Sequence, residues 1–457
     1  MSSALAATQP EPAPVTKASQ PRLTNNTLLA GACSVLLLGP LAFGAVEPWS
    51  IFALQACAML LVAVWAFRQW NSAELNISPH PLYRPMSAFF ALVLLQWLVG
   101  TTAYRQVTYS RLLLYAAYGM LVFIVTQTLR RSNQFQMMAK VVTAYGAVVA
   151  AFALLQGLAP NGKLYWIWAL QQGGSIYGPY VNRNHYAGLM EMLLPFPLVL
   201  AASRFTSGNR KLAVAGVAAL MGASIFLSGS RGGMAAFVVQ MLVLGVLLFR
   251  KRDGSWKQPI MLGAFLATIV VFLVWIGGSE LSERLMSIHS GAREEINGGV
   301  RLSIDRDCFR MFVKRPILGW GLGSFPIVYP QFRSFYTTFF VNQAHNDYLQ
   351  LLVETGVAGF AIAGWFLVLV FRQAAGKLNN WTETASGALT AAALLGCIGI
   401  LVHSVLDFNL QIPANAVLFY VLCALAASAP LQESQRRRVL RRHSLIMQPN
   451  PETTPTS

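Results

Sequence analysis

The amino-acid sequence is dominated by apolar runs, each about as long as a bilayer-spanning helix, which needs about 20 residues. The runs are apolar on all sides rather than along one stripe, as helices in contact with lipid must be. The run at 86–100 is short and gives the weakest signal. Twelve runs occur, at roughly 27–46, 50–67, 86–100, 110–129, 137–158, 185–203, 211–228, 233–249, 259–277, 346–371, 384–403 and 413–430. The sequence therefore predicts an all-α integral membrane protein with about twelve transmembrane helices.

The composition agrees with a membrane protein and excludes a single soluble core. Of the 457 residues, 55% are hydrophobic and only 11% are charged, whereas soluble domains carry about 25% charged residues. The formal net charge is +17, from 34 Lys and Arg against 17 Asp and Glu. Such an excess indicates either a nucleic-acid partner in a soluble protein or the basic cytoplasmic loops of a membrane protein.

The positions of the charges decide between these two explanations. If both termini are cytoplasmic, 21 of the 34 basic residues lie on the cytoplasmic side and 13 lie outside. Eight of the outer 13 belong to one long loop, and long loops count least in the positive-inside rule. Membrane orientation therefore accounts for the charge, and no nucleic-acid partner is expected.

This topology divides the chain into three regions. Residues 1–26 are rich in Ala, Pro and Thr and lack the apolar stretch of a signal peptide, so they are predicted to be a disordered cytoplasmic tail. Residues 27–430 form a polytopic membrane domain, and residues 431–457 form a basic cytoplasmic tail. The five Cys include no CxxC pair or Cys/His cluster, so no metal site is expected.

One connection, at roughly 278–345, is far longer than the others, and loops of this length are usually functional or form small domains. Its sequence predicts a helix over 301–314 that ends before Pro316, followed by a tight turn at Gly319, Gly321 and Gly323. The predicted apolar face of this helix consists of Leu302, Cys308, Phe309, Phe312 and Val313.

Polar motifs gather on the outer side of the predicted topology. Because they come from five separated segments at one depth, we expect them to converge into a site. The segments are 177–185, 228–233, the start of the loop helix at Arg301, 344–347 and 403–409.

Arg231 and His345 are the strongest candidates among these residues. Arg231 lies in a very short hairpin between two spans, where an arginine is costly unless it has a partner or a water-filled cavity. It can bind a phosphate bidentately, or it can simply anchor the topology. His345 begins a span, where it can act as a general base or merely cap the helix.

The remaining candidates also carry two interpretations each. Arg301 can bind an anion or pair with Asp305 on its own helix. Arg183 and Asn184 can hold an anion at a helix N-terminus or form an ordinary cap. Glu191 and Glu354 are the two intramembrane acids, either functional or paired with neighbouring helices. The participation of five further residues is left open: His289, Glu191, Glu354, His403 and Asp407.

The motifs together resemble the O-antigen ligase and polymerase superfamily of bacterial envelopes. The elements are NRNHYAGLMEMLLPF, then SGSRGG, then a long outer loop with R-x14-P-x2-GWGLGSF, then AHNDYLQLLVETG. The resemblance covers about residues 27–430. The SRGG and HNDYLQLLVETG elements are fairly specific together, and no Walker, dinucleotide-binding, HExxH or GxSxG motif is present.

The resemblance implies a multi-pass inner-membrane glycosyltransferase with a fold related to the GT-C type. Such enzymes need neither metal nor ATP, and they take a glycan from undecaprenyl pyrophosphate on the periplasmic face. Ligases transfer it to the lipid A core, and polymerases transfer it to another lipid-linked repeat. Carried over by motif, Arg231 and Arg301 would bind the pyrophosphate, and His345 would be the general base. Arg183 and Asn184 match a motif whose role is less clear.

Elementary chemistry is consistent with this implication. A pyrophosphate leaving group develops negative charge, which preorganised arginines in a dry cavity stabilise strongly. One base suffices because a diphosphate leaves without a general acid, so the carboxylate pair of soluble glycosidases is not required. A direct displacement inverts the anomeric centre.

Three alternatives remain open. The stretch HSVLDFNLQIPAN at 403–415 departs from the minimal ligase pattern and resembles members found with exopolysaccharide gene clusters, which favours a polymerase. A solute transporter of the bicarbonate type is a rival class, although transporters place polar residues near the midplane. A structural partner in an envelope complex is the third, but it would not explain the converging basic groups.

Overall fold

The structure is a computed structural model. It describes residues 22–428, except for 73–74, 76, 130, 171–173, 338–339 and most of 251–297. Most of the predicted span at 259–277, His289, the first part of the outer loop and the C-terminal tail lie outside the described residues. The first helix begins at Arg22, slightly before the predicted first span.

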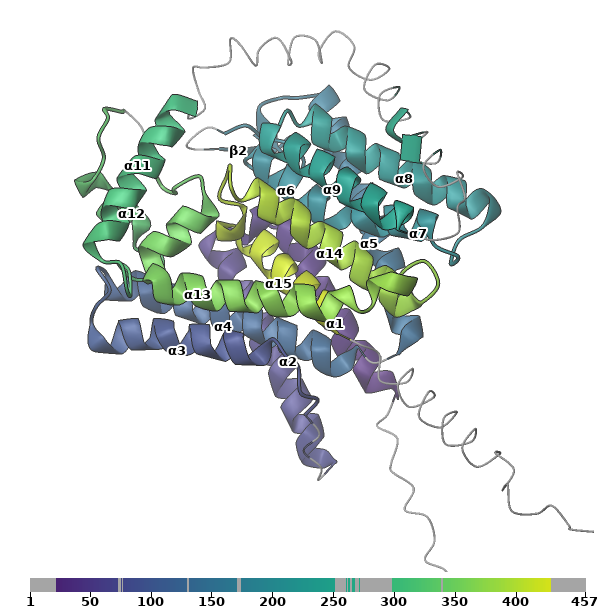
Figure 1. The fold of residues 1–457 in the computed structure, drawn as a ribbon, viewed down its shortest axis with the longest axis horizontal. Coiled ribbons are helices and arrows are strands. Elements are labelled where there is room, and N and C mark those ends of the chain that lie inside the picture. The colour runs from purple at the N-terminus through teal and green to yellow at the C-terminus, as the bar shows by residue number, and fades with distance from the viewer. Residues whose placement is uncertain are drawn as a thin grey trace, which may run out of the picture.

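The described residues form a bundle of α-helices, and eleven of the twelve predicted runs coincide with helices (Figure 1). One predicted run, at 185–203, is divided into two consecutive helices at Pro195. The helices are α1 (Arg22–Leu41), α2 (Pro48–Asn71), α3 (Tyr83–Val99), α4 (Arg105–Thr128), α5 (Ser132–Leu158), α6 (Arg183–Leu193), α7 (Pro195–Ala202), α8 (Gly208–Leu227), α9 (Arg231–Phe249), α13 (Asp347–Ala375), α14 (Ala385–His403) and α15 (Pro413–Ala427). The only sheet among the described residues is the hairpin of β1 (Lys163–Leu164) and β2 (Trp168–Ala169).

An all-α membrane architecture follows from the length and composition of these helices. In the described part of the chain, eight helical segments are long and apolar enough to cross a bilayer, with α6 and α7 counted as one. Three shorter apolar helices, at Asn25–Leu41, Tyr83–Val99 and Pro413–Ala427, also coincide with predicted spans. The number of twelve spans stays a prediction.

Two helical segments form the centre of the bundle. The α6–α7 segment and α14 are buried along most of their length, whereas α2 is largely exposed. Small residues explain the close packing of α14. A Cβ added to Gly396 would lie 2.8 Å from the carbonyl oxygen of Met192 in α6. The predicted runs therefore include helices that protein, not lipid, surrounds.

Two polar contacts lie at the end of the bundle where α13 and α15 end and α3 begins. At one end, Lys377 Nζ donates to the carbonyl oxygens of Ala426 and Ser428, both at 2.8 Å. His80 lies at this same end, with Nε2 3.2 Å from Ser428 Oγ. The polar motifs lie at the opposite end, where α14 ends at His403 and α13 begins at Asp347.

The outer loop contains the predicted helix, α11 (Gly298–Lys314), and a short helix α12 (Phe325–Val328). Figure 1 shows α11 crossing one end of the bundle at a steep angle to α13. The prediction of its apolar face was wrong for most of its members. Ile304, Cys308 and Met311 are buried. Leu302, Phe309 and Val313 are 52%, 60% and 58% exposed.

The orientation of α11 has a polar cause that apolar periodicity does not reveal. Asp307 is fully buried on the inner face. Its Oδ2 accepts from Ser334 N at 3.0 Å, from Ser334 Oγ at 3.2 Å and from the Tyr329 hydroxyl at 3.2 Å. A buried carboxylate must keep such partners, so Asp307 determines which of two apolar stripes faces the protein.

The glycine turn lies directly against α13. Gly356 has φ 65° and interrupts α13 there. The backbones of the turn and of α13 lie too close together for side chains at these glycines. A Cβ on Gly319 would lie 2.5 Å from the Glu354 carbonyl carbon, and a Cβ on Gly356 would lie 2.2 Å from Ile317 O. Glu354 accepts from the amides of Gly323 and Phe325 at 2.8 and 3.2 Å. Glu354 thus fastens the loop to the helix and does not enter the outer site.

Candidate functional site

The centre of the polar cluster is the first part of the connection between α14 and α15, residues 404–409, which is called the 404–409 connection below. Asp407 is buried in it. Its Oδ2 accepts a hydrogen bond from Asn184 Nδ2 of α6, and its Oδ1 lies 3.4 Å from His345 Nδ1. Asp407 therefore joins two of the predicted site residues, which lie far apart in the sequence.

His345 is held in a defined position at the start of α13. Its φ of 55° is unusual for a residue other than glycine, and such conformations cluster at functional sites. Asn346 follows as the helix N-cap, accepting from Tyr348 N at 3.1 Å and Leu349 N at 3.2 Å. The His345 ring meets Phe408 edge to face, with centroids 4.8 Å apart.

A second histidine flanks the same phenylalanine. The rings of His185 and Phe408 have their centroids 4.8 Å apart at an interplanar angle of 74°. Within the described residues, His185 Nε2 is buried and has no hydrogen-bond partner. Phe408 thus separates two imidazoles, and both face the 404–409 connection.

Electrostatics keep Asp407 ionised. Burial alone would raise the pKa of its carboxyl, but the contact with His345 and the nearby imidazoles of His185 and His403 hold the pKa well below its ordinary value. A carboxylate that stays charged can orient His345 and stabilise its protonated form. The separation of 3.4 Å is longer than a good hydrogen bond, as is common for catalytic pairs before substrate binds.

Asp347 attaches α13 to the 404–409 connection. Its Oδ2 accepts from Ser404 Oγ at 2.8 Å and from Leu410 N at 3.0 Å, and its backbone amide donates to Ser404 O at 2.9 Å. These three bonds fix the position of Asp347, and thereby the start of α13, two residues after His345.

Arg301 reaches the same connection from the outer loop. Its Nη1 donates to Leu406 O at 2.8 Å, one residue before Asp407. Among the described interactions, no ion pair joins Arg301 to Asp305, so the bond across the site replaces the pairing along the helix. Burial raises the pKa of Asp305, although the charges of Arg301 and His345 act to lower it. Asp305 therefore lies within electrostatic reach of both residues.

Arg183 and Arg231 meet at the turn between α8 and α9, residues 228–230. Asn182 caps α6 by accepting from Asn184 N at 2.8 Å, which fixes Arg183 as its first residue. The Arg183 guanidinium lies against this turn: a Cβ on Gly229, whose φ is 71°, would lie 3.2 Å from Arg183 Nη1. Arg231 is exposed and begins α9 directly after the turn.

The structure thus arranges the five predicted site residues in two groups. Asn184, Arg301 and His345 contact Leu406 or Asp407, and Arg183 and Arg231 lie at the α8–α9 turn. The buried pair of Glu191 and His403 lies between the two groups. Within the described ranges, no three or more His, Cys, Asp or Glu side chains are arranged to hold a metal ion.

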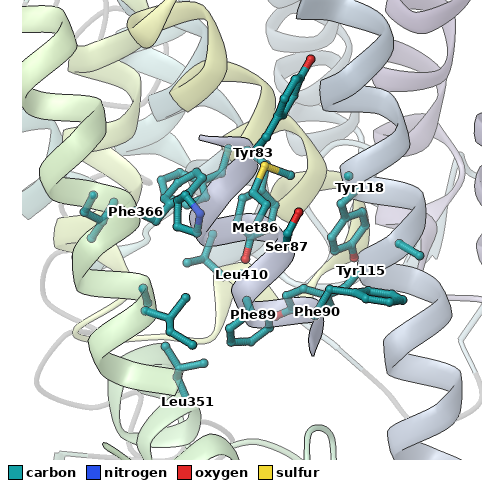
Figure 2. Close-up of a pocket in the computed structure, with 18 of the residues that line it drawn as sticks. Tyr83, Met86, Ser87, Phe89, Phe90, Tyr115, Tyr118, Leu351, Phe366 and Leu410 are labelled. Atoms are coloured by element: carbon teal, nitrogen blue, oxygen red, sulfur yellow. The ribbon is translucent and has the colours of Figure 1, made fainter. Parts of the chain in front are cut away.

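A partly open apolar cavity of about 670 Å³ lies between α3, α4, α13 and α15. Asp347, Tyr348 and Leu410 line it at the outer end, next to the site. Figure 2 shows Leu351 and Phe366 of α13 on one side and Tyr115 and Tyr118 of α4 on the other. The cavity therefore extends from the polar cluster along the spanning helices.

The comparison with protein families is consistent with this geometry. Residues 216–364 match the family model described as O-antigen ligase. The family resemblance is confirmed. The matched segment includes Arg231, Arg301 and His345, together with the outer loop between them. In general terms it supports a multi-pass membrane glycosyltransferase of the O-antigen ligase or polymerase type. A search of curated proteins finds no match to the chain.

Proposed function

We propose that this protein is an inverting, metal-independent glycosyltransferase acting at the periplasmic face of a bacterial inner membrane, with both termini cytoplasmic. It transfers a glycan from undecaprenyl pyrophosphate to an acceptor hydroxyl. One observation carries the proposal: three arginines and a histidine–carboxylate contact gather at one end of a bundle of apolar helices. This arrangement combines an anion site with a base beside the bilayer.

His345 is the proposed base, and Asp407 orients it. Because Nδ1 faces Asp407, the Nε2 lone pair of the neutral ring is available to the acceptor. The acceptor oxygen attacks the anomeric carbon while its proton moves to Nε2. The bond from that carbon to the pyrophosphate oxygen breaks on the opposite face, which inverts the centre.

The arginines stabilise the leaving group. Arg183 begins α6 and Arg231 begins α9, both beside the α8–α9 turn, and Arg301 comes from α11. Pyrophosphate gains negative charge as the bond breaks, and preorganised guanidinium groups stabilise that charge most strongly where water is excluded. Asn184 supports the base indirectly through Asp407.

The apolar cavity supports a long polyprenyl donor. Its lining on α13 includes Asp347, Tyr348 and Leu351 before the interruption at Gly356, and residues from Phe360 to Leu367 after it. A lining that is apolar on both sides of this interruption suits a long isoprenoid chain whose pyrophosphate lies at the polar cluster.

The first test is transfer in proteoliposomes with undecaprenyl-pyrophosphate-linked glycan. We expect Arg231→Ala and His345→Ala each to insert normally and retain less than about 1% of the transfer rate, since each removes a group that acts on the transition state. Arg310→Ala is the matched control because this arginine is exposed, on α11, and pairs with Asp307 outside the site. Full activity of both site variants would refute the mechanism.

Polymerase activity is the second candidate, and the 404–409 connection favours it. The residues that hold His345 belong to the stretch that resembles exopolysaccharide-associated members. Adding lipid A core as acceptor in one arm, and only lipid-linked repeat in the other, separates the two. Product in the first arm alone identifies a ligase, and product in the second identifies a polymerase.

A further inference from the structure

A buried acid–base pair lies beneath the start of α9. Glu191 Oε1 of α6 is 2.8 Å from His403 Nδ1 at the end of α14. The side chains are 0% and 1% exposed. Such a pair is expensive inside a membrane protein and marks function more often than stability. The mechanism above does not use it.

Two glycines bring α9 into direct contact with this pair. A Cβ on Gly232 would lie 2.4 Å from His403 Cδ2, and a Cβ on Gly233 would lie 3.1 Å from Glu191 Oε1. Gly233 also donates its amide to Ser230 Oγ at 3.2 Å, which caps α9. The first turn of α9, which begins with Arg231, therefore packs directly against Glu191 and His403, with no side chain between them.

The pair is also connected to the base. Asp407 N donates to His403 O at 3.1 Å, so the backbone of the residue that orients His345 is fixed to that of His403. Gln240 of α9 fixes the other partner's backbone, donating from Nε2 to Glu191 O at 2.8 Å and to Leu395 O at 2.9 Å. Through these contacts one buried unit touches both groups of site residues.

We propose that Glu191 and His403 are positioning residues that set the location of Arg231 relative to His345. The pair fixes the first turn of α9 on one side and the 404–409 connection on the other. It thereby sets the distance between the anchor of the donor pyrophosphate and the base that activates the acceptor. This inference rests on the proposed role of Arg231.

A double-mutant cycle tests the inference. Glu191→Gln and Arg231→Lys should each lower kcat/KM for the lipid-linked donor at least tenfold and leave the acceptor KM unchanged. If Glu191 acts through Arg231, the double variant should be no more than about threefold below the worse single variant, because residues that act as a unit are not additive. Multiplication of the two single effects would overturn the proposal.

Tyr186→Phe is the matched control for buried hydrogen bonding. Tyr186 belongs to the same helix as Glu191, is fully buried and donates to Ser224 Oγ at 2.8 Å. We expect this variant to lower the thermal midpoint without changing donor kcat/KM. If Glu191→Gln lowers only the midpoint, as the control does, the pair is structural and the inference fails.

A size exchange covers the case in which Glu191→Gln does not fold. Gly232→Ala should reduce donor kcat/KM by displacing the start of α9, and combining it with His403→Ala should restore space but not activity. Recovery in that double variant would show that packing alone matters and would refute the inference. An Arg231→Lys variant with unchanged donor kinetics would instead refute the proposed function, so the two failures are distinguishable.

Discussion

Two buried carboxylates in the outer half of the protein, Glu354 and Asp407, are held in contrasting ways. Glu354 accepts from two backbone amides of the loop and from Gln350 Nε2. Asp407 accepts one backbone amide, from Phe408, but its other contacts are side chains of distant segments, Asn184 and His345. A carboxylate bound by backbone amides holds the fold in place. A carboxylate beside a histidine can orient the imidazole and stabilise the proton that it takes up. Glu354 thus shapes the outer loop, whereas Asp407 belongs to the candidate site.

The largest expected effect on the transfer rate comes from a substitution of Asp407. Asp407→Asn keeps the size of the side chain but removes the charge that orients His345 and stabilises its protonated form. Because general-base catalysis contributes about 100-fold or more, we expect the transfer rate to fall by about that factor. Single-turnover transfer measures the rate, and a cooperative unfolding transition, even at a midpoint below that of the wild type, shows that the fold persists. A variant that transfers as fast as the wild type would remove Asp407 from the mechanism.

The converse change is Glu354→Gln. Its amide would present a donor where two backbone amides need an acceptor, which costs about 1–3 kcal/mol for buried groups left unsatisfied. We expect lower stability in detergent unfolding but a transfer rate per folded molecule within about threefold of the wild type. A loss of rate as large as that of Asp407→Asn would show that the two carboxylates do not differ in role.

The smallest expected effect concerns how the stability of the protein depends on pH. The pKa of Asp407 is depressed in the folded state, so its contribution to stability is present above the unfolded value of about 3.9 and is lost as pH falls through the folded value. Stability curves of the wild type and of Asp407→Asn should therefore run parallel between about pH 5 and 8. The two curves should converge only below about pH 4. Divergence near neutral pH would contradict an ionised Asp407.

The sequence located the apolar helices well because bilayer thickness fixes how long an apolar run must be. Eleven runs coincide with helices, including the short run 86–100. It also placed Arg183, Arg231, Arg301 and His345 at one end, because basic side chains are costly inside an apolar run. Their roles remain proposals.

What the sequence did not reveal depends on contacts between distant residues. Nothing local indicates that Asp407 meets both Asn184 and His345, or that Glu354 binds the glycine turn instead of a neighbouring helix. The position of His403 and Asp407 at the close of one span was a visible signal, but it left their participation open. The face of α11 was predicted wrongly because its two apolar stripes compete, and the buried Asp307 selects between them.

The bond from Arg301 Nη1 to Leu406 O joins the outer loop to the segment that follows α14. Arg301 lies on α11, in the middle of that loop, whereas His345 lies at the loop's end against α13, and Arg183 and Arg231 begin α6 and α9. Changes elsewhere in the loop can therefore leave the proposed base and its carboxylate in place. Loop grafts between relatives should retain transfer as long as an arginine is kept at this position.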